Sequence, residues 1–89
     1  MRAVISVVGK DRTGILAKVS GKCFELNANI VDVTQTILED LFVMVMLAEI
    51  DRINCDYQRF VALFTELAEE NGLKIHVMNE DIFNAMHRI

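Results

Sequence analysis

The stretch Gly9-Lys10-Asp11-Arg12-Thr13-Gly14-Ile15-Leu16 decides how this chain folds. An apolar run, Ala3–Val8, leads into it, and apolar residues at three- and four-residue intervals follow it. These patterns predict a strand and then a helix, so the stretch between them is a tight turn. The first N–H groups of a helix lack partners and attract anions. We therefore expect either a plain connection whose glycines serve the backbone, or an anion-binding turn.

The length of 89 residues predicts one domain, residues 1–89, with a modest core. No apolar run reaches the ~18 residues that a membrane helix needs, and the longest, Leu41–Ala48, has the length of a strand. The N-terminus lacks the long apolar segment and the cleavage site of a signal peptide. We expect a cytoplasmic protein that does not associate with membranes.

The charge is distributed unevenly along the chain. Residues 1–22 carry five basic side chains and one acidic one, whereas residues 23–89 carry four basic and twelve acidic ones. The acidic remainder argues against direct nucleic-acid binding. The basic first segment suits a small anionic group such as a carboxylate.

The reactive side chains form no recognisable catalytic or metal-binding pattern. Cys23 and Cys55 are far apart and lack the spacing of a zinc site or a disulfide framework. His76 and His87 have no evident partner for acid–base work. We therefore predict no catalytic residue, no metal and no cofactor.

The periodicity of the chain predicts an order of elements. We expect strands at 3–8, 30–37, 41–50 and 73–78, helices at about 13–26 and 56–71, and a helical tail at 79–89. The order β-α-β-β-α-β with a central hairpin is that of a ferredoxin-like sandwich. Right-handed crossovers place both helices on the same face. The predicted fold is thus α+β: a four-stranded antiparallel sheet, two helices on one face, and a short C-terminal helix.

Several residues mark the ends of the predicted helices. Asp11 or Thr13 is expected to cap the first helix and Asn54 the second, because a side-chain oxygen there accepts from a free N–H group. Gly72 is expected to end the second helix, and Asn79 to cap the tail.

The first helix has a clear buried stripe and one unusual residue. The stripe recurs at three- and four-residue intervals, at Ile15, Val19, Cys23 and Leu26. Gly21 interrupts this helix at a cost of about 1 kcal/mol relative to alanine. A close approach of another helix or of the sheet would explain that glycine.

The strand at 41–50 is apolar on both faces. One face carries Phe42, Met44, Met46 and Ala48, and the other carries Leu41, Val43, Val45 and Leu47. Two helices cover only one side of a small sheet, and monomers seldom expose a large apolar patch. The other side therefore needs the tail or a second subunit. In the tail, Ile82, Met86 and Ile89 form an apolar stripe with Phe83 beside it.

Residues Val8–Ala17, followed by Glu25–Ile30, resemble an ACT domain. That family has a strand, then Asp-Arg-x-Gly-aliphatic-aliphatic-Ala, then a helix, and Asn-Ile opening the second strand. The ending Ile82–Ile89 is similar to that of a small group of stand-alone ACT proteins from bacteria and archaea. This group is related to the ACT domains of the glycine cleavage repressor.

The resemblance implies a ligand site, because ACT domains usually pair and bind amino acids or other metabolites at the interface. The positions that match the family's binding residues are Asp11, Arg12, Thr13, Gly14, Ile15, Leu16, Asn29, Ile30 and Asp32. Gly14 would let the backbone approach the ligand, and the N–H groups of Ile15 and Leu16 would receive a carboxylate. Asp11 or Asp32 would accept from an ammonium group. Arg12 would pair with the carboxylate or hold the loop.

The resemblance implies a regulatory domain that senses an amino acid, forms a homodimer or higher homo-oligomer through its sheet, and acts on a protein partner. The alternative is an interaction module without a ligand. An acylphosphatase-like enzyme is disfavoured: Arg12 is in the right region, but the Gly-x-Val-Gln-Gly loop and the following Phe-Arg are missing. We expect no enzymatic activity.

Overall fold

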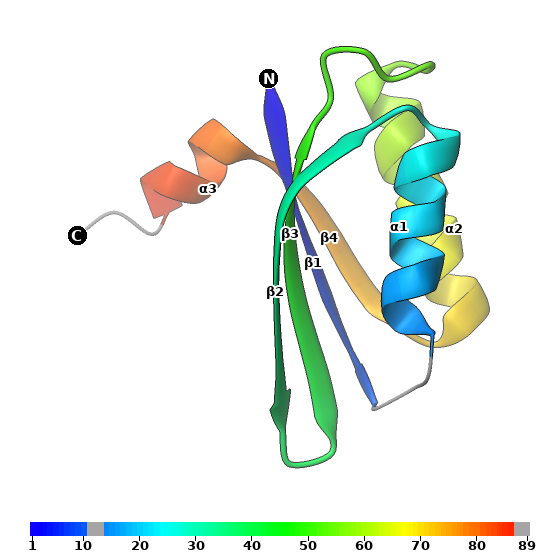
Figure 1. Cartoon of the computed structure of the whole chain (residues 1–89), viewed down its shortest axis with the longest axis vertical. Helices are drawn as coiled ribbons and strands as arrows, with labels where there is room; N and C mark the ends of the chain where they lie inside the picture. The colour runs from blue at the N-terminus through cyan, green and yellow to red at the C-terminus, as the bar shows by residue number, and fades with distance from the viewer. Residues whose placement is uncertain (11–13, 87–89) are drawn as a thin grey trace.

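The computed structural model describes residues 1–10 and 14–86. Along the chain its elements are β1 (Arg2–Lys10), α1 (Ile15–Glu25), β2 (Asn29–Leu38), β3 (Leu41–Glu49), α2 (Tyr57–Asn71), β4 (Lys74–Asn79) and α3 (Glu80–Met86). The sheet has the order β2-β3-β1-β4, and each strand runs antiparallel to its neighbours. This is the predicted ferredoxin-like fold (Figure 1).

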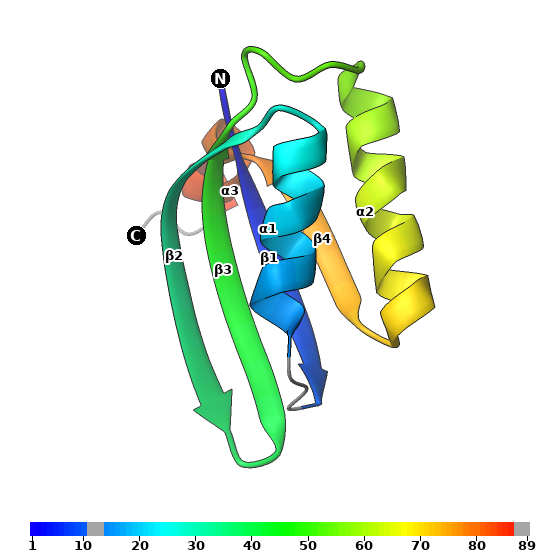
Figure 2. The same cartoon turned by 45° about the vertical axis from the view of Figure 1, so that its right-hand side comes forward.

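Helices α1 and α2 lie side by side on one face of the sheet (Figure 2). The predicted stripe of α1 is buried against it, and so are the residues predicted for that face of β3: Phe42, Met44, Met46 and Ala48. From α2, Phe60 and Phe64 enter the core with ring centroids 5.0 Å apart. The core therefore fills the space between these two helices and β3, β1 and β4.

The helix ends follow the predictions in part. Gly72 ends α2 with φ +64°, and Asn79 Oδ1 accepts from Asp81 N at 2.8 Å at the start of α3. The prediction for Asn54 was wrong. Asp56 caps α2 by accepting from Arg59 N at 2.7 Å. The side chain of Asn54 instead donates to the backbone oxygen of Glu25 at 2.8 Å, which satisfies a carbonyl at the end of α1.

The expected close approach at Gly21 was also wrong for the single chain. A Cβ placed on this exposed residue would have no atom within 4 Å apart from its own helix. Nothing within the described parts of the chain therefore requires glycine there.

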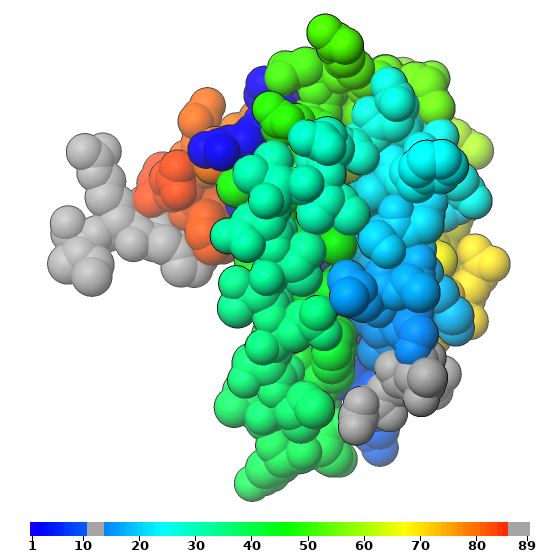
Figure 3. All heavy atoms as spheres, in the orientation of Figure 1, coloured from blue at the N-terminus to red at the C-terminus, as the bar shows by residue number. Residues whose placement is uncertain are grey.

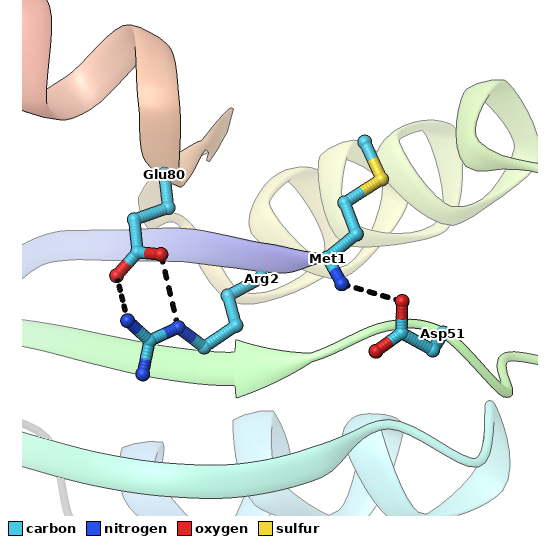
Figure 4. A network of polar contacts seen from close by, with 4 residues as sticks. All are labelled: Met1, Arg2, Asp51 and Glu80. Carbon is cyan, nitrogen blue, oxygen red and sulfur yellow. Dashed lines mark hydrogen bonds and ion pairs between the residues drawn. The ribbon is translucent and has the colours of Figure 1, made fainter.

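Helix α3 lies on the face of the sheet opposite α1 and α2 (Figure 1). The Arg2 guanidinium holds it through two contacts with the Glu80 carboxylate, of 2.9 Å from Nε and 2.6 Å from a terminal nitrogen (Figure 4). Close by, the amino group of Met1 pairs with the Asp51 carboxylate. The N-terminal residues thus anchor both α3 and the loop after β3.

The described part of the tail, α3, covers only part of this second face. Phe83 lies beside Val4, which is 6% exposed, whereas Ile82 is 56% exposed. The predicted stripe was therefore wrong about Ile82, because Phe83 and not Ile82 packs toward the sheet. The Met86 side chain and Ile89 lie outside what is described. Leu38, Leu41 and Val45 remain exposed on this face.

Candidate ligand site

The start of α1 is built from backbone rather than from side chains. Gly14 occupies the N-cap with φ +88°, in the left-handed region that glycine adopts most easily, and its carbonyl accepts from Lys18 N at 2.9 Å. No side chain caps this helix among the described residues. Ile15 is buried and Leu16 is exposed. The predicted site residues Asp11, Arg12 and Thr13 lie outside the described residues.

The predicted residues at the start of β2 lie at the other end of α1. The Asn29 side chain donates to the Glu49 carboxylate at 2.7 Å and lines a hollow of about 250 Å³. The other residues around this hollow are Asn27, Glu49, Asp51 and Arg52. Ile30 is half-buried and packs against the core. Since α1 has 11 residues and rises about 1.5 Å per residue, roughly 16 Å separates its two ends.

Asp32 lies on yet another surface. Ile30 is opposite Ala48, and Asp32 is opposite Leu47, so the extra residue Val31 forms a β-bulge between them. Asp32 therefore shares the face of Leu47, away from α1 and α2. Within one chain, the described residues of the predicted site therefore lie in three separate places: the start of α1, the start of β2 and the open sheet face.

Sequence reasoning missed the acidic and basic groups beside Asn29. Glu49 joins the hollow because it is opposite Asn29 in the β2–β3 ladder, and Arg52 joins it from the loop after β3. Register is a long-range property, and neither residue lies in a recognisable local motif. Asn27 was a usable signal, because asparagine tolerates left-handed backbone angles and this residue adopts φ +62°.

The cysteine on α1 is unsuited to nucleophilic chemistry. Cys23 is fully buried with its Sγ 3.8 Å from Met46 Sδ, and desolvation raises the pKa of its thiol to about 11. In the described part of the chain, no three His, Cys, Asp or Glu side chains are grouped in a way that would hold a metal ion. Nor does any helix there have the length and apolar character needed to cross a membrane.

The family model of the ACT domain matches residues 2–78. The chain belongs to the ACT-domain family. It is 48% identical to a UPF0237 protein of Listeria innocua over 89 residues, covering all of both chains. It is 39% identical to an ACT domain protein from Streptococcus pneumoniae whose structure has a TM-score of 0.83, covering 98% of each chain.

The fold also occurs inside larger assemblies. The regulatory subunit of aspartate kinase from Thermus thermophilus has a TM-score of 0.66 at 20% identity, over 85% of this chain and 49% of that one. At that identity the likeness concerns the fold alone. ACT domains are commonly ligand-binding regulatory domains of enzymes and repressors in amino acid metabolism.

Proposed function

We propose that this ACT domain is a non-catalytic regulatory module that pairs with a second copy, binds an amino acid where the two copies meet, and acts on a protein partner. The observation that carries the proposal is the separation of Gly14 and Asn29 at opposite ends of α1, beside the edge strand β2. One chain alone cannot place both residues on one small ligand.

Pairing of two chains about a two-fold axis beside β2 would bring the two separated regions of the site together. An edge strand offers unpaired N–H and C=O groups to another strand. If two copies of β2 pair antiparallel, the start of one lies beside the end of the other. Because α1 and β2 run in opposite directions (Figure 2), Gly14 would then lie near the partner subunit's Asn29.

The apolar residues on this side support the same pairing. Lys18 Nζ bonds Asn71 of α2 at 2.7 Å, so the other flank of α1 faces away from α2. That flank carries Leu16 and Phe24, and Phe24 is 86% exposed. Helix α1 and strand β2 lie next to each other on one surface (Figure 3), and Ile37 of β2 is 57% exposed. A stable monomer rarely leaves such a combination bare.

The polar groups near the two ends of α1 suit the two opposite charges of a zwitterion. The first N–H groups of α1, which no described side chain caps, favour a carboxylate. Glu49, which the Asn29 side chain holds at 2.7 Å, offers negative charge to an ammonium group from the partner's side. An amino acid would then bridge the two subunits and stabilise the pair.

Light scattering and a thermal-shift screen with the common amino acids test the proposal. We expect twice the chain mass of 10.1 kDa and a raised melting temperature with one class of amino acid. A ligand at 100 times its Kd adds about 2.7 kcal/mol to the folded state.

Phe24→Asp should abolish both pairing and the response. Ile82→Asp is the matched control, because it places the same charge on an exposed apolar position of α3, away from β2. A monomer that still responds would refute the shared site. A persistent dimer whose melting temperature responds to no amino acid would favour the interaction module without a ligand. The exposed Phe24 supports that alternative too, because pairing through it needs no ligand.

A further inference from the structure

We propose a second ligand site on the open sheet face, between α3 and the strands, for a small apolar compound that carries an ammonium group. A hollow of about 180 Å³ lies there. Val4, Val45 and Leu47 form its apolar floor, Phe83 of α3 forms one wall, and Asp32 and Thr34 of β2 form another. The site lies on the opposite side of the sheet from α1, so it does not rest on the function proposed above.

The β-bulge aims Asp32 into this hollow. Side chains alternate between faces along a strand, so Ile30 and Asp32 would normally share a face. The extra residue Val31 breaks this alternation: Ile30 packs toward the core, and Asp32 lies on the open face opposite Leu47. Bulges often re-aim a side chain beside a functional site.

The Asp32 carboxylate at this hollow has no counter-charge among the described residues. Asp32 Oδ1 accepts from Val33 N at 2.9 Å, which fixes the carboxylate, and Asp32 forms no ion pair within the described chain. The other carboxylate at the hollow, that of Glu80, is paired through both oxygens with Arg2. A bound cation would therefore interact with Asp32.

A neighbouring hollow provides an internal contrast. It lies on the other side of Phe83, has a volume of about 290 Å³, and is lined by Val4, Ser6, His76 and Met78. It shares the apolar floor and the Phe83 wall but has no carboxylate. We therefore expect an ammonium compound to enter the smaller hollow, beside Asp32, and to leave the larger one empty.

The volume sets the size of the ligand. An apolar cavity of about 150 Å³ holds benzene. A hollow of about 180 Å³ thus accepts a ring with a short chain, and phenethylammonium is a suitable probe. Its ring would pack against Val45, Leu47 and Phe83, and its nitrogen would lie at the Asp32 carboxylate.

Titration of the full chain with phenethylammonium, followed by amide chemical shifts, tests this site. We expect shifts at Thr34, Val45 and Phe83 and none at Gly14. The neutral analogue 2-phenylethanol and the anionic 3-phenylpropionate should bind at least about ten-fold more weakly, equivalent to about 1.4 kcal/mol. Equal binding of the alcohol, shifts centred on Gly14, or no shifts at tens of millimolar would overturn the proposal.

Two variants with equal charge changes separate direct contact from long-range attraction. Asp32→Asn should weaken phenethylammonium binding about ten-fold, while its amide oxygen can still accept from Val33 N and keep the bulge. Asp40→Asn removes the same charge from the exposed β2–β3 turn and should leave the affinity unchanged. Equal affinities in the two variants would overturn the assignment of Asp32.

Discussion

Replacing Gly21 by alanine should stabilise this protein. A Cβ at Gly21 would meet no atom of the described chain within 4 Å outside its own helix, and the residue does not occupy the left-handed region. The substitution therefore adds a methyl group to an exposed helix position without a clash and without backbone strain. The sequence alone leaves the outcome open, because a close approach of another helix or of the sheet would explain a glycine at this position.

The magnitude follows from helix propensity. Glycine is about 0.8–1.0 kcal/mol less favourable than alanine in a helix interior. For a domain of this size, 1 kcal/mol corresponds to about 4–8 °C in melting temperature. We expect Gly21→Ala to raise the melting temperature by about that amount and to raise the urea midpoint with an unchanged m value.

Gly14→Ala is the matched control. A Cβ at Gly14 would also meet none of the described residues within 4 Å, but φ is +88°. Since the left-handed conformation costs other residues about 1–2 kcal/mol, this variant should lose stability while Gly21→Ala gains it. Relative to the described residues, the two glycines differ in backbone angle and not in available space.

Urea and thermal unfolding of both variants provide the measurement, at one fixed chain concentration because the proposed pairing would contribute to stability. Repeating it in a Phe24→Asp background removes the proposed pairing. If Gly21→Ala lowered stability in the original background alone, Gly21 would face a partner helix. If it lowered stability in both backgrounds, the reasoning from free space and backbone angle would be refuted.

Three further substitutions test individual contacts. Gly9→Ala should lower the free energy of unfolding by about 1–2 kcal/mol, because the added Cβ would overlap Leu73 Cδ2. In a double-mutant cycle measured by urea unfolding, Leu73→Val should relieve that cost. Glu39→Gly should gain about 1 kcal/mol, since Glu39 has φ +57° in the β2–β3 turn, and an unchanged melting temperature would contradict this. Because the pKa of the Cys23 thiol is higher in the folded than in the unfolded chain, the free energy of unfolding should fall by about 2–3 kcal/mol between about pH 9 and pH 11. Unfolding of Cys23→Ala over the same pH range should show a smaller fall.

The fold was predictable because its local and long-range signals agree. The stripe of α1 and the alternation of β3 each name the residues that the structure buries, such as Val19 and Met44. The strand ends were less predictable. β1 extends from Arg2 to Lys10, beyond its apolar run, because backbone pairing continues opposite Glu49 and Leu41 whatever the side chains are.

Two of the errors share a cause, which is competition between neighbouring residues for one role. Asn54 and Asp56 are both good caps, and the choice between them depends on a carbonyl at Glu25, far away in sequence. Ile82 and Phe83 are both apolar, and the Arg2–Glu80 pair helps decide which of them packs toward the sheet. Local sequence identifies the candidates, but tertiary contacts choose among them.

The candidate site illustrates the same limit at the level of function. The motif groups Asn29, Ile30 and Asp32 as three neighbours on one strand, yet a single bulged residue sends Ile30 to the core and Asp32 to the open face. The alternation of side chains along a strand, with its period of two, does not predict an inserted residue.

Because Asp32 and Gly14 lie on opposite sides of the sheet, an amino acid held at α1 and an ammonium compound held beside α3 do not compete for space. The two proposals can therefore fail separately, and Asp32→Asn is the variant that distinguishes them: it should weaken binding of phenethylammonium and leave the response to amino acids intact.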